Sequence, residues 1–126
     1  MKLTRKEAIE LDVVLTNKKV TKLSDEVVFA MIDNKISLSK IAKEMDEAKR
    51  IASESCKPEE LKAEGAETTR ELENKWNAKF NEYMSKYLDE EVEVELSTLS
   101  KGDFKTIVSE NGMTIGDAAI LSIIRA

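Results

Sequence analysis

The sequence predicts a mainly α-helical protein built around a long antiparallel helical hairpin that resembles a coiled coil. Between Ser24 and Ser55, apolar or small residues recur at alternating steps of four and three, which is the spacing of one face of an α-helix. A second run with nearly the same spacing lies between Thr69 and Asp89. The chain holds only 1 Pro and 4 Gly, and 36% of its residues are charged while 5% are aromatic. This composition suits long helices better than a thick globular core.

We expect the 126 residues to form a single domain with three consecutive parts. Residues 1–23 would form an N-terminal helix and a connector. Residues 24–90 would form the helical hairpin. Residues 91–126 would add a strand and short helices. One or two short β-strands are expected in all.

The first helix is expected to begin after Thr4, because Thr4 and Glu7 have the spacing of a capping box. It would run to about Thr16. Its predicted inward face consists of Ala8, Leu11, Val14 and Leu15.

The long helix of the hairpin is expected to begin after Ser24, a good N-cap residue. Its apolar face would consist of Val27, Met31, Asn34, Leu38, Ile41, Met45, Ala48 and Ala52. Asn34 is the one polar member of this face. We expect it to lie at the edge of the face and meet water. Alternatively, it sets the register or the oligomeric state, as a lone buried Asn does in coiled coils.

The second helix of the hairpin carries most of the aromatic residues. Pro58 would open a short helical turn that Gly65 ends, and Thr68 with Glu71 would cap the helix that follows. Large side chains then recur on one face: Leu72, Trp76, Phe80, Tyr83 and Tyr87. We expect this face to pack on the small residues of the long helix. An exposed Trp76 would instead be an interface anchor.

Residues Glu91 to Leu96 alternate strictly between Glu and apolar residues, which predicts a β-strand. Val92, Val94 and Leu96 would lie on one face of it. The nearest partner is Met1 to Thr4, whose Lys2 would meet the glutamates. Otherwise the strand would pair with another chain.

The C-terminal segment predicts two short helices. Ser100 and Asp103 would cap the first, which would run to Val108, and Thr114 with Asp117 would cap the second. The last helix is apolar nearly all round, so it is either buried in a core or docked into a neighbouring chain. The candidate interface residues of the whole chain are Asn34, Trp76, Val92, Val94, Leu96, Ile120, Leu121 and Ile124.

The net charge of −5 disfavours a general nucleic-acid binder, because such proteins need a basic surface. Basic residues are nevertheless concentrated near the N-terminus, whereas residues 89–95 carry five acidic residues and no basic one. Two solvated surfaces are the simpler interpretation of this asymmetry. The candidate anion-binding residues are Lys2, Arg5, Lys18, Lys19 and Lys22.

The sequence lacks the residues that several kinds of catalysis require. The chain has no His, which removes Ser-His-Asp and Cys-His catalysis, and its one cysteine, Cys56, cannot form a disulfide within the chain. No nucleotide-binding loop or calcium-binding loop motif is present. We therefore expect no enzyme activity, no cofactor and no metal site. We also expect a reducing cytoplasmic setting, no signal peptide and no membrane span.

The order of features resembles that of a family of small uncharacterised proteins encoded by tailed bacteriophages. The resemblance covers nearly the whole chain. It includes the start Lys-Leu-Thr-Arg-Lys-Glu-Ala-Ile-Glu-Leu and the closing Met-Thr-Ile-Gly-Asp-Ala-Ala-Ile-Leu, and it is sharpest from Leu88 to Leu96. It implies a location in the host cytoplasm during infection, in the virion, or both.

Two functions follow as hypotheses. In the first, a non-enzymatic phage protein acts by association, as a virion component or an assembly factor, with a phage or host protein or a second copy of the chain as its partner. In the second, the protein inhibits a host defence, either by binding a host protein or by sequestering a small signalling nucleotide. A third, weaker hypothesis is a regulator that docks on nucleic acid.

Overall fold

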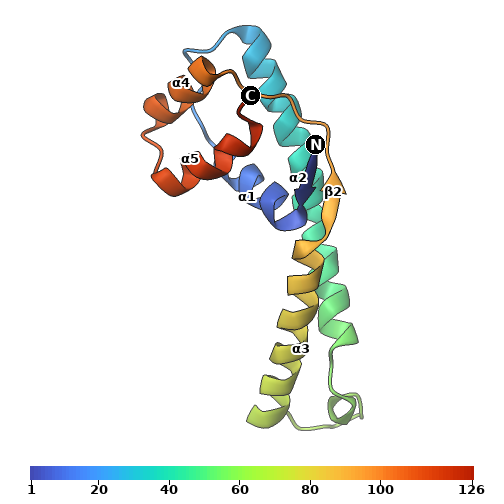
Figure 1. The fold of residues 1–126 in the computed structure, drawn as a ribbon. Helices are drawn as coiled ribbons and strands as arrows, with labels where there is room; N and C mark the ends of the chain where they lie inside the picture. The colour runs from blue at the N-terminus through green and yellow to red at the C-terminus, as the bar shows by residue number, and fades with distance from the viewer. The chain divides into compact units, whose positions relative to one another are not determined.

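The computed structural model describes all residues 1–126 and confirms a mainly α-helical fold with one small antiparallel sheet (Figure 1). There are five α-helices, two strands and two 3₁₀ turns. In chain order the elements are β1 (Lys2–Thr4), α1 (Arg5–Leu15), α2 (Asp25–Ser55), η1 (Glu59–Leu61), α3 (Arg70–Asp89), β2 (Glu91–Glu93), α4 (Lys101–Asn111), α5 (Ile115–Leu121) and η2 (Ser122–Ile124).

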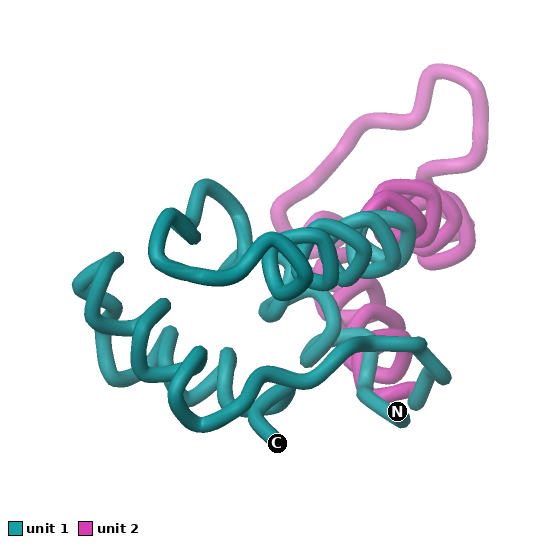
Figure 2. The backbone as a smooth tube through the Cα atoms, turned by 90° about the horizontal axis from the view of Figure 1, so that it is seen from above, with its two compact units in different colours: residues 1–42, 91–126 teal, residues 43–90 magenta.

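The chain divides into two compact units, shown in different colours in Figure 2. Unit 1 comprises residues 1–42 and 91–126, and unit 2 comprises residues 43–90. The division differs from the three consecutive parts that the sequence suggested. Both ends of the chain fold with the first part of α2, and the boundary falls inside this continuous helix.

In unit 1 the predicted helix N-caps are confirmed. Each predicted cap accepts a hydrogen bond from a backbone N–H three residues further on: Thr4 from Glu7, Ser100 from Asp103 and Thr114 from Asp117. In unit 2 the predicted cap is wrong by one residue. Thr69, not Thr68, is the N-cap of α3, and its hydroxyl accepts from the N–H of Leu72 at 3.2 Å. The tip of unit 2 has the expected short turn, η1, followed by Gly65 at φ 75°.

The sheet of unit 1 joins the two segments that the sequence paired. β1 and β2 are antiparallel, with Lys2 opposite Glu93 and Leu3 opposite Val92. The regular strand ends at Glu93 rather than at Leu96, although the N–H of Val94 still donates to the carbonyl of Met1 at 2.9 Å. The glutamate-rich strand therefore takes its partner from its own chain.

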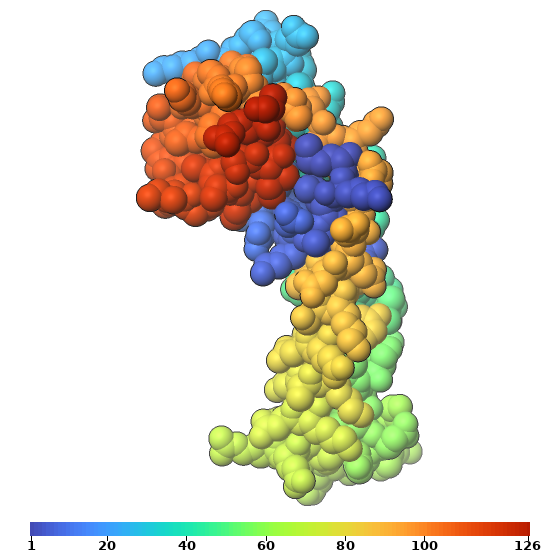
Figure 3. Space-filling model, in the orientation of Figure 1, coloured from blue at the N-terminus to red at the C-terminus, as the bar shows by residue number.

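The hydrophobic core of unit 1 gathers residues from both ends of the chain. α1 contacts α5, and Figure 3 shows the C-terminal residues in red beside the N-terminal residues in blue. The largest fully buried apolar side chains of this core are Leu11, Leu38, Leu99, Ile107, Leu121 and Ile124. The docking interpretation of the last helix is therefore wrong for Leu121 and Ile124, and Ile120 packs against the same core. Only one side of this helix is covered, because Ile115 at its start is 91% exposed, and the helix ends at Leu121 before a 3₁₀ turn.

Unit 2 is a helical hairpin made from residues 43–55 of α2 and all of α3, which run antiparallel (Figure 1). Ala48 and Ala52 are buried, as the small-residue spacing predicted. The indole N–H of Trp76 donates to the carbonyl of Ser53 at 2.9 Å and ties the two helices together. Met84 is the buried side chain of α3, whereas Tyr83 is exposed.

Candidate interaction surface

Three large apolar side chains of α2 in unit 1 are exposed. Phe29 is 65% exposed, Ile32 is 46% exposed and Ile36 is 52% exposed. Their steps of three and four place them in one row along the helix. We call Phe29, Ile32 and Ile36 the α2 stripe. Single exposed apolar residues are ordinary in soluble proteins, but a contiguous row of large ones marks a binding surface.

The α2 stripe lies on the side of the helix opposite the buried residues. Met31, Asn34 and Leu38 face the core of unit 1 and are at most 6% exposed. At about 100° per residue, Phe29, Ile32 and Ile36 point roughly 180° away from them. This part of α2 is therefore apolar on two opposite sides. The core covers only one of them, so the exposed side is not explained by folding.

A small groove borders the stripe. Its cavity of about 140 Å³ is mostly apolar and is lined by Leu15, Lys18, Val20, Val28, Met31, Ile32, Lys35 and Ile107. Lys35 is fixed at its rim, because its ammonium lies 2.6 Å from a carboxylate oxygen of Asp12, which also accepts from the Ser39 hydroxyl at 2.9 Å. Ile32 belongs to both the groove and the stripe, so the two form one continuous apolar surface.

Asn34 is buried and fully engaged within unit 1. Its side chain is 1% exposed; its amide N–H donates to the carbonyl of Ser97 at 2.9 Å, and its amide oxygen accepts from the N–H of Ser97 at 2.8 Å. The expectation that Asn34 meets water is therefore wrong. Because both ends of the amide are paired inside the chain, Asn34 does not offer an interface to another molecule either.

The remaining predicted interface residues are distributed over both units. In unit 1, Val94 is buried, while Val92 and Leu96 are half-buried beside the sheet. In unit 2, Trp76 is half-buried and hydrogen-bonded within the hairpin. None of these four side chains is exposed.

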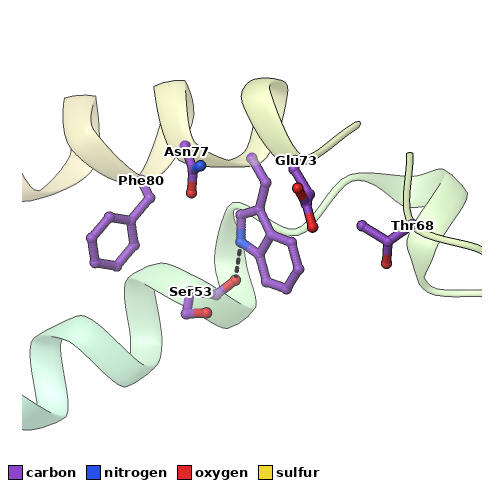
Figure 4. Close-up of a pocket in the computed structure, with 6 residues that line it drawn as sticks. Ser53, Thr68, Glu73, Asn77 and Phe80 are labelled. Atoms are coloured by element: carbon purple, nitrogen blue, oxygen red, sulfur yellow. Dashed lines mark hydrogen bonds between the residues drawn. The ribbon is translucent and has the colours of Figure 1, made fainter. Parts of the chain in front are cut away.

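An open cleft lies beside Trp76 in unit 2. Its cavity of about 600 Å³ is lined by Ser53, Thr68, Glu73, Trp76, Asn77 and Phe80. Figure 4 shows Glu73, Asn77 and Phe80 projecting from α3 toward the end of α2 that carries Ser53. The Trp76 N–H is already paired, and none of the lining side chains is fully buried. The cleft therefore lacks an unpaired buried polar group that would fix a ligand.

The candidate anion-binding residues do not converge on one site. Lys2 lies on β1 and Arg5 begins α1, whereas Lys18, Lys19 and Lys22 follow the end of that helix. The 11 residues of α1 separate the two groups, which amounts to about 16 Å at 1.5 Å per residue. A single small anion would not reach both groups.

Two carboxylates of unit 1, the exposed Glu93 and the half-buried Glu110, have lowered pKa values. The hydrogen bond from the Met1 ammonium, at 2.9 Å, is the main reason why the pKa of Glu93 lies below its usual value. The Thr21 hydroxyl donates to Glu110 and is the main reason why the pKa of that carboxyl is lowered. Each of these hydrogen bonds joins two segments that are far apart in the chain. The lowered pKa values are therefore explained by contacts that hold the fold together.

No protein-family model, curated protein or solved structure matches this chain. No group of three or more His, Cys, Asp or Glu side chains is placed to hold a metal ion. No helix combines the length and the apolar character that crossing a membrane requires.

The α2 stripe was not among the predicted interface residues. The sequence does carry a signal for it, since Phe29, Ile32 and Ile36 have helical spacing of their own. That row is displaced by half a turn from the row of Met31, Asn34 and Leu38. The prediction followed the longer row, which the core does cover, and did not consider the second, shorter row on the same helix.

Proposed function

We propose that this protein is non-enzymatic and acts by associating with another protein through the α2 stripe. The observation that carries the proposal is the row of Phe29, Ile32 and Ile36, exposed on a helix whose opposite side already fills the core. Fully burying a large apolar side chain contributes roughly 1.5–3 kcal/mol. Large apolar anchors surrounded by polar residues are the usual centre of a protein interface.

We place this association in a bacteriophage, as a virion component or an assembly factor. The support for this setting is the resemblance of the chain's layout to small tailed-phage proteins, sharpest from Leu88 to Leu96. A virion component remains in purified particles of the encoding phage, whereas an assembly factor is absent from them. Mass spectrometry of purified particles therefore separates the two roles.

Photo-crosslinking tests the surface directly. A photoreactive amino acid is placed at Asp33, which is exposed and lies next to the stripe in the helix, and the protein is expressed in bacterial cells, with and without infection. We expect one adduct of defined mass above the 14.2 kDa of the chain. The adduct should be lost in the double variant Phe29→Ser/Ile36→Ser, because the apolar contact that holds the partner is removed.

A matched control is available on the same unit. Val13 on α1 is 65% exposed, like Phe29, but is not part of the stripe. The variant Val13→Ser should keep the adduct. An adduct that survives the stripe variant, or that disappears equally with Val13→Ser, would contradict the proposal.

Inhibition of a host defence is the alternative. A version that binds a host protein would use the same stripe, and the adduct would then contain a host protein. For the version that sequesters a nucleotide, no observation favours a site, because the basic residues at the two ends of α1 do not form one pocket. A thermal-shift screen with nucleotides should therefore give no response.

A further inference from the structure

We infer that the partner at the α2 stripe is a second copy of this chain, docked with its α2 antiparallel to the first. This inference rests on the proposed function, since it names the partner of the same surface. It is carried by charged residues that continue the stripe at both ends. Asp25 lies four residues before Phe29, and Lys40 lies four residues after Ile36.

The face therefore has the order acid, apolar, apolar, apolar, base. The steps from Asp25 to Phe29, Ile32, Ile36 and Lys40 are four, three, four and four, so all five residues share one side of α2. Asp25 and Lys40 are exposed, and neither has an interaction partner within the chain. Each of the two charges is thus available to another molecule.

This order is complementary to itself when one helix is reversed. The residue numbers of Asp25 and Lys40 sum to 65, and so do those of Phe29 and Ile36. In an antiparallel pair centred beside Ile32, each Asp25 therefore meets the other copy's Lys40, and each Phe29 meets the other copy's Ile36. The two ion pairs lie about 22 Å apart, on either side of an apolar centre. This is an isologous twofold contact.

The charges also exclude the parallel arrangement. In a parallel pair with the same stripe in contact, Asp25 would face Asp25 and Lys40 would face Lys40, and both contacts are repulsive. A different protein would need the same reversed order of charges by coincidence. A second copy supplies it necessarily. The contact is small, so we expect a Kd on the order of 1–100 μM.

Sedimentation velocity over a range of concentrations tests the dimer. The single variants Asp25→Lys and Lys40→Asp each turn two attractive pairs into two repulsive ones and should raise the Kd roughly tenfold or more. The double variant restores opposite charges and should return the Kd to within about threefold of the original. The control Lys105→Asp makes the same charge change as Lys40→Asp at an exposed residue of α4, which is not part of the stripe, and should leave the Kd unchanged.

A crosslinking measurement tests the direction. In a Cys56→Ser background, the variant Ile32→Cys places a thiol beside the twofold axis, and a short bismaleimide should join the two copies. Lys40→Cys should not self-link, because its two copies would lie about 22 Å apart. Efficient self-linking of Lys40→Cys would show a parallel pair and overturn the inference.

The outcomes distinguish the inference from the proposed function. A wild-type chain that remains monomeric at about 1 mM, together with a stripe-dependent photo-adduct to a different protein, overturns the second-copy partner and leaves the association surface standing. A dimer that is unaffected by Phe29→Ser/Ile36→Ser overturns the inference, because its contact lies elsewhere, and the proposed function is overturned only if the photo-adduct also survives this variant. Loss of the dimer with charge reversal and its return with the double reversal support both. Circular dichroism of every variant shows that the helices remain folded.

Discussion

Asn34 is the only polar side chain among the buried residues, and it joins α2 to a segment 63 residues further along the chain. Its amide pairs with both the N–H and the carbonyl of Ser97. The variant Asn34→Ala leaves both backbone groups without this partner. We expect it to lower the free energy of unfolding by roughly 1–3 kcal/mol, measured by urea denaturation.

Two further variants separate the hydrogen bonds from simple loss of packing. Asn34→Asp keeps an acceptor for the Ser97 N–H but loses the donor to its carbonyl, so it should also destabilise the protein. Ser97→Ala keeps both backbone groups and should change the free energy of unfolding by less than about 0.5 kcal/mol. If Asn34→Ala were as mild as Ser97→Ala, the paired amide would not contribute to stability.

The contact between Thr21 and Glu110 predicts a pH dependence. The hydroxyl of Thr21 lowers the pKa of Glu110 below its ordinary value of 4.5. A carboxyl whose pKa is lower in the folded state stabilises the fold above its unfolded pKa and loses this contribution as the pH falls through the folded pKa. Thr21→Val should therefore be less stable than the wild type at neutral pH, and the difference should vanish in acid.

An NMR titration of the Glu110 carboxyl measures the same effect directly. In Thr21→Val its pKa should rise toward the ordinary value, because the hydrogen bond to the charged form is gone. Thr21→Ser keeps a hydroxyl and should preserve the lowered pKa. An unchanged pKa in Thr21→Val would assign the shift to the neighbouring Lys22 and the backbone instead.

At the scale of elements, α4 ends because Gly112 adopts a left-handed conformation, with φ 54° and ψ 44°. This geometry lets the N–H groups of Gly112 and Met113 reach the last carbonyls of the helix. Gly112→Ala adds a side chain that disfavours positive φ, so we expect a loss of roughly 1 kcal/mol. Thermal denaturation followed by circular dichroism measures it.

Gly116 supplies the matched control for this substitution. It lies inside α5, has no positive φ and has open space where a Cβ would be added. Gly116→Ala should therefore be neutral or stabilise the protein by up to about 1 kcal/mol. Equal effects at Gly112 and Gly116 would mean that the turn after α4 does not require a glycine.

The elements that local signals determine are the ones that the sequence predicted well. Helix starts at Thr4, Ser100 and Thr114 follow from side chains that satisfy backbone N–H groups a few residues away. The pairing of Met1–Thr4 with the glutamate-rich strand was also predicted, because few other segments have extended character.

Features that depend on distant partners could not be predicted in the same way. Asn34 has a partner only because folding brings Ser97 to it, and nothing near Asn34 in the sequence indicates this. The last helix is apolar whether it is enclosed or docked, so its composition did not reveal that Leu121 and Ile124 lie in the core. The exposed α2 stripe was not predicted because the prediction followed only the longer apolar row of that helix.

At the scale of the whole molecule, the two units differ in how much apolar surface they bury. Unit 1 encloses Leu, Ile, Val and Met side chains from α1, α2, α4 and α5, with η2. The buried residues of unit 2 are Ala48, Ala52, Pro58, Leu61 and Met84. Local stability rises with buried apolar contact. We therefore expect the hairpin of unit 2 to unfold at lower urea concentration than unit 1.

The chain contains its own probes for this difference. The single Trp and both Tyr residues lie in α3, so their fluorescence reports on unit 2, whereas circular dichroism reports on helices of both units. The fluorescence midpoint should fall at lower urea than the midpoint of the remaining circular dichroism signal. Coincident midpoints would indicate one cooperative transition that α2 transmits between the units.

Paired core variants then assign each transition to its unit. Leu121 is fully buried in unit 1, so Leu121→Ala should cost about 2–5 kcal/mol and lower only the later transition. Met84 is buried in unit 2, so Met84→Ala should lower only the fluorescence transition. If Leu121→Ala shifted both transitions equally, α2 would couple the hairpin to the core of unit 1. A partner bound at the α2 stripe in unit 1 would then also stabilise unit 2 by mass action, and the fluorescence of Trp76 would report that binding.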